Sequence, residues 1–338
     1  MKRICVVDTV YTLLLYYLIC GINPDDLFIM SGGIPESIRR NIDHIYFPQF
    51  RHEDIVDYSS VKKFIKRGII IVKRVYGIIK LRIILFFKTR NYEVGVYGQG
   101  HLNFSFPLYE YENTYLIEDG LYNYANPETP VYVNSKLKNF FGFYFDNFYA
   151  GFGTHDNIKK IYLTKNEVPE IVKQKTEVIN LKELWDNKTD AEKNRILRIF
   201  NIEDMIKDIE DNPTLMLTQC FSEDGLIPLE EEIAIYTELI SRQETQNVII
   251  KTHPREKKDY REIFPDLTVI DKPFPLEILK CMGIKINKVI TVSSTAALNF
   301  MDECEIELYD GKTSSDELDM MMRYLNKEIA KKQGYHEK

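Results

Sequence analysis

Residues 288–298 read KVITVSSTAAL, an apolar run followed directly by hydroxyl residues and a helix-prone segment. A short apolar run bounded by polar residues is typical of a buried strand, and Ser and Thr are common helix caps. The same order of strand, polar turn and helix recurs along both halves of the chain. Alternating strands and helices indicate an α/β protein with parallel sheets.

The predicted strands fall into two groups, one in each half of the chain. The first group comprises residues 4–9, 26–32, 44–49, 92–99, 114–120 and 158–164. The second comprises residues 214–220, 247–254, 267–273, 288–294 and 306–311, with helical segments at 229–242, 275–283, 295–302 and 314–332. We therefore expect two Rossmann-like domains facing a cleft, at residues 1–165 and 213–338, joined by a charged, helix-prone connection at 166–212.

Length and composition limit the function classes. The chain has 338 residues, enough for about two domains. Its net charge of −7, from 44 basic and 51 acidic residues, excludes a nucleic-acid binder by bulk charge. The five cysteines are scattered and form no Cys-x-x-Cys pair, which argues against a zinc site or disulfides and favours the cytoplasm. Asp8 interrupts the first apolar run, so we expect no secretory signal.

One segment departs from the acidic balance. Residues 61–90 contain ten Lys or Arg and no Asp or Glu, interleaved with Ile, Val and Leu. This pattern predicts a basic amphipathic helix, which suits an anionic membrane surface. A solvated helix face on the outside of a domain explains the same pattern. The expected location is therefore cytoplasmic, with peripheral attachment at the inner face of a bacterial membrane left open.

Polar and titratable residues gather where the predicted strands end. In open α/β sheets, ligands bind beyond the carboxyl ends of the strands. Ser293, Ser294 and Thr295 lie at a strand-to-helix junction whose hydroxyls and amides suit a phosphate. His253 follows another strand, where an imidazolium would stabilise charge on a leaving group. Asp119 follows a third strand and would accept a proton from an attacking hydroxyl.

Each of these features also has a plain structural explanation. The hydroxyl residues serve equally as an ordinary helix cap, and a lone histidine is commonly structural. Asp119-Gly120 is a common turn sequence, and a second copy occurs at Asp224-Gly225. We favour the first copy because it ends its strand directly. No P-loop and no dinucleotide fingerprint is present.

Five short motifs in a fixed order carry a resemblance to a known family. They are YGQGHL (97–102), YLIEDG (115–120), LTQCFSEDG (217–225), KTHPRE (251–256) and VSSTAAL (292–298). In this order the chain resembles the bacterial lipooligosaccharide sialyltransferases, glycosyltransferase family fifty-two, which include capsule-type members. The resemblance implies a GT-B fold and an inverting, metal-independent enzyme. Its donor would be CMP-sialic acid, its acceptor a terminal sugar of a surface glycan, with galactose and an α-2,3 linkage expected, and it would need no cofactor.

The resemblance also implies roles for particular residues. Asp119 would be the general base, and His253 would contact the CMP phosphate as acid or charge stabiliser. The implied donor-binding residues are Ser293, Ser294, Thr295, Glu277, Lys251, Thr218, Gln99 and Gly100. Glu277 would bind ribose hydroxyls, although Leu276 intervenes where related enzymes tend to have Pro-Phe-Glu.

An aromatic segment follows the strand that bears the predicted base. Residues 140–152 read FFGFYFDNFYAGF. Aromatic faces bind sugar rings, and they also pack in cores and at oligomer contacts, so a homodimer stays open. The candidate acceptor-binding residues are Tyr122, Tyr124, Asp146 and Asn147.

Two alternatives remain after this reading of the sequence. The first is a GT-B transferase that uses another nucleotide sugar, such as a UDP-hexose. A diphosphate donor usually requires more Arg or Lys than a monophosphate donor, which favours CMP-sialic acid. The second is a non-catalytic protein that docks on membranes through residues 61–90.

Overall fold

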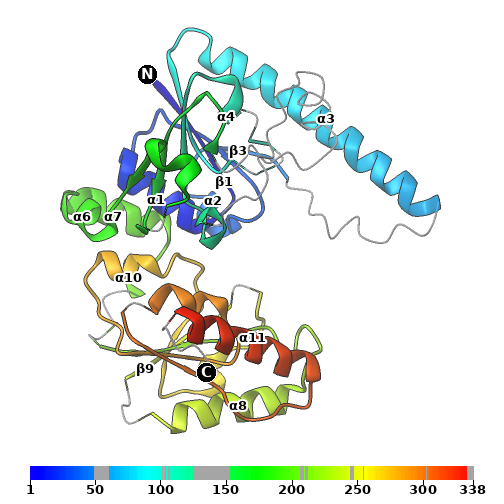
Figure 1. The fold of residues 1–338 in the computed structure, drawn as a ribbon, viewed down its shortest axis with the longest axis vertical. Helices are drawn as coiled ribbons and strands as arrows, with labels where there is room; N and C mark the ends of the chain where they lie inside the picture. Colours follow the sequence, from blue (N-terminus) through cyan, green and yellow to red (C-terminus); the bar gives the residue numbers. More distant parts are fainter. Residues whose placement is uncertain are drawn as a thin grey trace. The chain divides into compact units, whose positions relative to one another are not determined.

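The structure is a computed structural model of the whole chain. It describes residues 1–48, 61–100, 102, 104–105, 107–124, 153–166, 168–205, 209, 212–243, 247–253, 255–301 and 303–332. Unit 1 consists of Met1–Asn201 and Phe274–Cys281, and unit 2 of Ile202–Pro273 and Met282–Lys338 (Figure 1).

Unit 1 is built on a seven-stranded sheet in the order β3-β2-β1-β4-β5-β6-β7, and every neighbouring pair is parallel. Its strands are β1 (Lys2–Val7), β2 (Leu27–Met30), β3 (His44–Tyr46), β4 (Val94–Gly98), β5 (Asn113–Ile117), β6 (Ile158–Leu163) and β7 (Thr176–Val178). Its helices are α1 (Val10–Cys20), α2 (Glu36–Arg39), α3 (Val61–Thr89), α4 (Pro107–Glu110), η2 (Leu121–Tyr124), η4 (Glu170–Lys175), α6 (Leu181–Asp186), α7 (Asp190–Ile199) and α10 (Glu277–Cys281).

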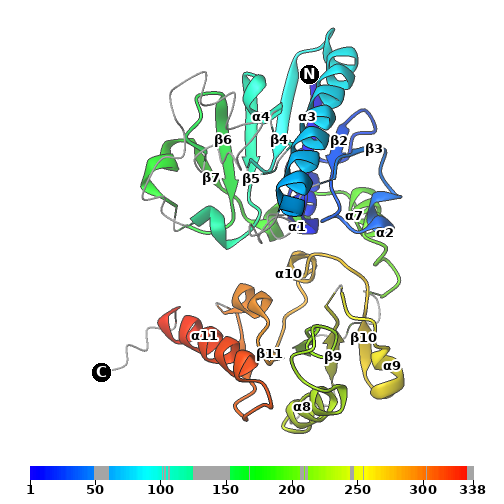
Figure 2. The ribbon, with the colours of Figure 1, turned by 90° about the vertical axis from the view of Figure 1, so that its right-hand side faces the viewer.

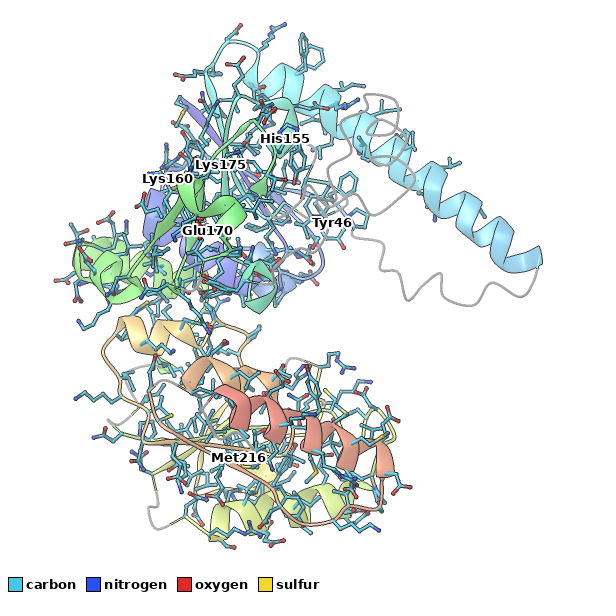
Figure 3. The ribbon with its side chains drawn as sticks, in the orientation of Figure 1. Tyr46, His155, Lys160, Glu170, Lys175 and Met216 are labelled. Carbon is cyan, nitrogen blue, oxygen red and sulfur yellow. The ribbon has the colours of Figure 1, made fainter. Side chains whose placement is uncertain are left out.

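Unit 2 contains a five-stranded parallel sheet in the order β10-β9-β8-β11-β12. Its strands are β8 (Thr214–Leu217), β9 (Val248–Lys251), β10 (Thr268–Ile270), β11 (Lys288–Thr291) and β12 (Glu305–Leu308). Its helices are α8 (Leu229–Ser241), α9 (Tyr260–Ile263), η6 (Thr295–Phe300) and α11 (Asp316–Lys332). Met216 of β8, labelled in Figure 3, is fully buried in this unit. The predicted α/β class with two parallel sheets is confirmed.

Alternate residues of the first sheet face two different helices. Ile4, Ile29 and Val96 belong to one apolar cluster with Ile78 and other residues of α3. Figure 2 shows α3 lying across this face of the sheet. Side chains of opposite orientation face α1, where the Tyr16 ring lies 5.5 Å from the ring of Phe28 and 5.8 Å from that of Tyr97. A parallel sheet covered on both faces leaves only the strand ends for polar chemistry.

The first strand-to-helix turn is fixed by local capping. The Thr9 side chain accepts a hydrogen bond from the Thr12 amide at 3.2 Å and so caps α1. Gly21 ends the helix with φ of 69°, a conformation that a side chain disfavours. The turn between β1 and α1, which carries Thr9, lies at the carboxyl end of β1, next to the end of β4.

Two segments depart from the expected order of domains. Residues 170–199, within the predicted connection, form η4, β7, α6 and α7 of unit 1. Phe274–Cys281 also belongs to unit 1, although it follows β10 of unit 2, because α10 packs against α6. Glu277 therefore lies in unit 1, although its position in the sequence predicts the second domain.

The basic segment forms one long helix, as its pattern predicts. α3 extends beyond the rest of unit 1 at its first residues (Figure 1). Among the described residues, no helix combines the length and the apolar character that a membrane span requires.

Gly98 is the tightest point of the carboxyl edge of the first sheet. Its φ is 127°, and a Cβ atom there would lie 1.9 Å from the carbonyl oxygen of Val6 on β1. We predict that Gly98→Ala lowers the free energy of unfolding by about 2–4 kcal/mol, because strain and overlap add. Gly225→Ala is the matched control, since its φ is 72° but no atom lies within 4 Å of its Cβ position. It should cost about 1 kcal/mol. Urea unfolding measures the free energy of unfolding of both variants. Equal decreases in the two variants would contradict the packing argument.

Candidate active site

The carboxyl ends of three adjacent strands bring together those predicted donor-side residues that belong to unit 2. Leu217 pairs with Lys251 on one side and with Thr291 on the other. Thr218, His253 and Ser293 follow these strands. Strands in a sheet lie about 4.8 Å apart, so the edge from β9 to β11 spans roughly 10 Å. Thr218, His253 and Ser293 therefore line one continuous edge of the sheet.

A buried carboxylate holds this edge in place. One oxygen of Glu256 accepts hydrogen bonds from the Thr218 hydroxyl and, at 2.6 Å, from the main-chain N–H of His253. Its other oxygen accepts from the Tyr260 hydroxyl at 2.6 Å. Burial raises the pKa of Glu256, and these hydrogen bonds oppose that rise. Glu256 thus ties the loops after β8 and β9 to one another.

The hydrogen bonds around the His253 ring define its tautomer. The Arg255 main-chain N–H lies 3.2 Å from Nδ1, so Nδ1 must accept and the neutral ring carries its proton on Nε2. The Cys220 Sγ also lies 3.0 Å from Nδ1, and burial raises the pKa of this thiol to about 11. Burial lowers the pKa of His253, and the charges of Arg255 and Lys251 lower it further. These effects favour the neutral form of the ring in the free protein, whereas the sequence predicts an imidazolium beside a bound phosphate.

The remaining donor-side residues differ in how they are held. The Ser293 hydroxyl is buried and has no hydrogen-bond partner in the described part of the chain. The Ser294 main-chain N–H donates to the Thr291 hydroxyl at 3.2 Å, while Thr295 is exposed at the start of the six-residue helix η6. Lys251 is buried and donates to the Thr252 carbonyl at 2.9 Å. Burial lowers the pKa of this lysine to about 8.

The second acidic motif is tied to basic partners. Both carboxylate oxygens of Asp224 accept from Arg255 at 2.9 Å, and the ion pair lowers the pKa of Asp224. An acid with a lowered pKa and both oxygens engaged is a weak base. This arrangement makes Asp224 a poor candidate for the base.

Three carboxylates beside this motif have the spacing of a cation site. Glu223, Glu232 and Glu256 form the group. The Lys258 ammonium lies among them, at 2.9 Å from Glu223, 2.8 Å from Glu232 and 3.5 Å from Glu256. An ammonium held among three carboxylates, of which Glu232 is buried and Glu223 exposed, is a structural arrangement, and it occupies the position that a metal would take.

In unit 1, Asp119 lies in a turn fixed by Asn123. The Asn123 side-chain oxygen accepts from the main-chain N–H groups of Asp119, at 2.8 Å, and Gly120, at 3.2 Å. Gly120 has φ of 149°, a conformation that favours glycine. These bonds fix the main chain that carries Asp119 at the end of β5. Asn123 is not among the residues predicted from the sequence, although an Asn placed to accept from its own turn is a recognisable pattern.

The neighbouring acid, Glu118, is a structural anchor. One of its oxygens accepts from the Tyr124 hydroxyl at 2.6 Å, and from the Thr164 main-chain N–H at 2.6 Å and hydroxyl at 2.8 Å. Burial, followed by the Glu118 charge, raises the pKa of Tyr124. Tyr124, a predicted acceptor-binding residue, is therefore engaged in holding the β5 and β6 ends together.

Gln99 and Gly100 follow β4 on the same sheet edge. The Gln99 side-chain oxygen accepts from the Asp8 main-chain N–H, whereas its buried nitrogen has no partner in the described part of the chain. The Gly100 carbonyl accepts from the Tyr109 hydroxyl at 2.5 Å.

Glu277 contributes to the raised pKa of Tyr11, after burial and Glu118. Glu277 is thus close to the edge that carries Asp119.

The other predicted acceptor residues are only partly described. Tyr122 lies in η2, and its side chain is outside the description. Asp146 and Asn147, with the aromatic segment around them, also lie outside the described residues. Their predicted role stays a prediction.

Comparisons with known proteins agree with this architecture. The model of glycosyltransferase family 52 matches residues 58–314. An uncharacterized protein of Haemophilus influenzae is 37% identical over 227 residues, which is 67% of this chain and 71% of that protein. The GT-B domain of a sialyltransferase from Photobacterium damselae aligns over 99% of this chain and 97% of its own, with TM-score 0.57 and 12% identity. An alpha/beta-galactoside alpha-2,3-sialyltransferase from Photobacterium phosphoreum aligns over 96% of both chains, with TM-score 0.50 and 12% identity. The two solved structures show that the fold is GT-B.

The state of His253 is directly measurable. We predict the Nε2–H tautomer at neutral pH and a pKa below 6.5, because burial and the Arg255 N–H disfavour the charged ring. Between the lowered pKa and 6.5 the unfolded chain binds the proton more readily, so acidification through this window removes stability. Histidine ¹⁵N NMR, assigned with His253→Asn, reports both properties. An Nδ1–H tautomer, or a pKa above 6.5, would contradict the assigned hydrogen bonds.

Proposed function

We propose that this chain, which belongs to glycosyltransferase family 52, transfers sialic acid from CMP-sialic acid to a hydroxyl of a terminal sugar. Membership of this family establishes that the protein is a glycosyltransferase. The observation that carries the finer proposal is the donor edge of unit 2, where His253, Thr218 and the buried Ser293 hydroxyl line adjacent strand ends. Such an edge suits one phosphate group. The names of the two Photobacterium proteins of the same fold support the same donor sugar.

The reaction needs stabilisation of negative charge on the leaving CMP and a base for the proton of the acceptor hydroxyl. The bond from the sialic acid anomeric carbon to the phosphate oxygen breaks, and its electron pair leaves with CMP. The acceptor oxygen attacks that carbon from the opposite face, which inverts its configuration, and its proton passes to a base. Asp119 would take this proton, because it lies at a strand end in a turn that Asn123 fixes.

On the donor side, a neutral His253 would donate from Nε2 to a phosphate oxygen. Because Nδ1 already accepts from Arg255, the ring is oriented before any ligand binds. The Ser293 hydroxyl would gain the partner that it lacks in the described residues. Groups aimed in advance at developing negative charge stabilise a leaving phosphate without a metal ion. This is the basis of the proposed metal independence.

The finer specificity is also part of the proposal. The acceptor would be a terminal galactose of a bacterial lipooligosaccharide or capsule, linked α-2,3, and Gln99 and Gly100 would lie beside the sialic acid. Glu277 would bind ribose hydroxyls. A homodimer and a peripheral location at the inner face of the membrane belong to the same set of proposals.

The rival donor is a nucleoside diphosphate sugar, such as a UDP-hexose. In the described residues, Arg255 pairs with Asp224 and Lys258 with glutamates, so two cations near the donor edge already have carboxylate partners. This favours a donor with a single phosphate. Incubation with CMP-sialic acid or UDP-hexoses and a panel of galactosides, followed by mass spectrometry, tests the choice. Transfer of a hexose alone would reject the sialyl proposal.

Asp119→Asn tests the proposed base. The variant keeps the size of the side chain and removes its basicity, so the transfer rate should fall by about 10²–10⁴-fold. CMP affinity should change less than about threefold, because Asp119 acts on the acceptor. Asp224→Asn is the matched control, and we expect it to retain at least about a tenth of the activity. Initial rates by mass spectrometry and CMP titration measure these effects. A larger loss in the control would transfer the role of base to Asp224.

Chelation tests the proposed metal independence. We expect EDTA to leave the rate of sialyl transfer unchanged, because the proposed charge stabilisation comes from His253, hydroxyls and main-chain N–H groups. The rate is measured before and after dialysis against EDTA, with Mg²⁺ or Mn²⁺ added back as the control. Loss of activity with recovery on addition of either ion would contradict this account.

A further inference from the structure

Cys220 is a buried residue in the loop that follows β8, at the donor edge of unit 2. The main chain on both sides of it is fixed by hydrogen bonds. The Gln219 main-chain N–H donates to the Tyr236 hydroxyl at 3.0 Å, and Tyr236 belongs to α8 and is fully buried. The Cys220 carbonyl accepts from the Asp224 main-chain N–H at 2.8 Å. The fold of unit 2 therefore sets the position of the Cys220 thiol.

Two hydrogen-bond donors converge on Nδ1 of the His253 ring. The Cys220 Sγ lies 3.0 Å from this nitrogen, and the Arg255 main-chain nitrogen lies 3.2 Å from it. Burial raises the pKa of the Cys220 thiol to about 11, so the thiol carries its proton at neutral pH. Such a thiol donates a weak hydrogen bond to the lone pair of Nδ1. The thiol and the main-chain N–H thus share one acceptor and favour the same Nε2–H tautomer.

The surroundings of the ring differ from those of a histidine whose Nδ1 is bound by a carboxylate, which stabilises the imidazolium. Burial lowers the pKa of His253, and the charges of Arg255 and Lys251 lower it further. The charges of Asp224 and Glu223 oppose this effect, but both oxygens of Asp224 already accept from Arg255. In the part of the chain that the structure describes, the hydrogen bonds of the ring nitrogens include no carboxylate. The thiol lies where such a carboxylate would be placed.

We propose that Cys220 is a positioning residue for His253, whose S–H group holds Nδ1 as an acceptor so that the ring presents Nε2–H to the phosphate of the donor. This inference deepens the proposed function and rests on it. A neutral ring fixed in this orientation needs no rearrangement when negative charge develops on the departing CMP. The thiol itself touches no substrate and acts only through the ring.

Paired substitutions in the full chain separate the hydrogen bond from the packing of the thiol. Cys220→Ala removes the donor, whereas Cys220→Ser keeps one in a side chain of similar shape. We expect Cys220→Ala to lower kcat for sialyl transfer by about 3–10-fold, the range of one hydrogen bond, with a smaller change in KM for CMP-sialic acid. Cys220→Ser should restore kcat to within about twofold of the wild type.

Cys304→Ala is the matched control for the loss of a thiol. Cys304 directly precedes β12, and because the strands are parallel it lies at the edge of the sheet opposite to Cys220. Its substitution should leave kcat within about twofold of the wild type, because no step of the proposed reaction involves that edge.

Histidine ¹⁵N NMR gives a readout that a merely structural role would not change. In Cys220→Ala the pKa of His253 should rise and the Nδ1–H tautomer should gain population, because one of the two donors that favour an unprotonated Nδ1 is lost. In Cys220→Ser and Cys304→Ala both properties should match the wild type. The spectra need no substrate, so they test the inference separately from the transfer of sialic acid.

Two results would overturn the inference. One is a Cys220→Ala protein whose His253 tautomer and pKa equal those of the wild type, whatever its rate. The other is an equal loss of kcat in Cys220→Ala and Cys220→Ser, which would assign Cys220 to packing alone. Failure of the proposed function is distinguishable from both, because the wild type would then transfer no sialic acid while the spectra still separate Cys220→Ala from Cys220→Ser.

Discussion

The structure depends on a single constraint, that its parallel sheets are covered on both faces. Every residue of β2 and β4 in unit 1, and of β8 and β9 in unit 2, is buried. Burying an unpaired charge inside such a strand would cost several kcal/mol, so titratable groups belong at strand ends. The carboxyl edges are therefore where catalytic chemistry can be placed.

Each of these edges has a buried carboxylate beside the candidate catalytic residue. Glu118 precedes Asp119 and binds the ends of β5 and β6 together. Glu256 binds the main chain of His253 and the Thr218 hydroxyl. In both units a glutamate side chain fixes the loop that carries the candidate catalytic residue. Loops fixed in this way need little rearrangement when charge develops on a substrate.

Much of this arrangement follows from the sequence, because apolar runs and strand-end residues are local features. The strands ending before Asp119, Thr218, His253 and Ser293 are those that the pattern predicts. β7 was missed because it has only three residues beside a charged segment. The lowered pKa of His253 depends first on burial of the ring, which no local pattern shows, and then on the charges of Arg255 and Lys251. The place of Glu277 in unit 1 depends on tertiary packing, so no local pattern could reveal it.

Binding of free nucleotides tests the central claim most directly, because it isolates the donor edge from acceptor and catalysis. Isothermal titration compares CMP, CDP and UDP on the wild-type chain and on Ser293→Ala. The account predicts that CMP binds at least tenfold more tightly than UDP. It also predicts that loss of the Ser293 hydroxyl weakens the binding of CMP. Tight binding of UDP without binding of CMP would contradict the account.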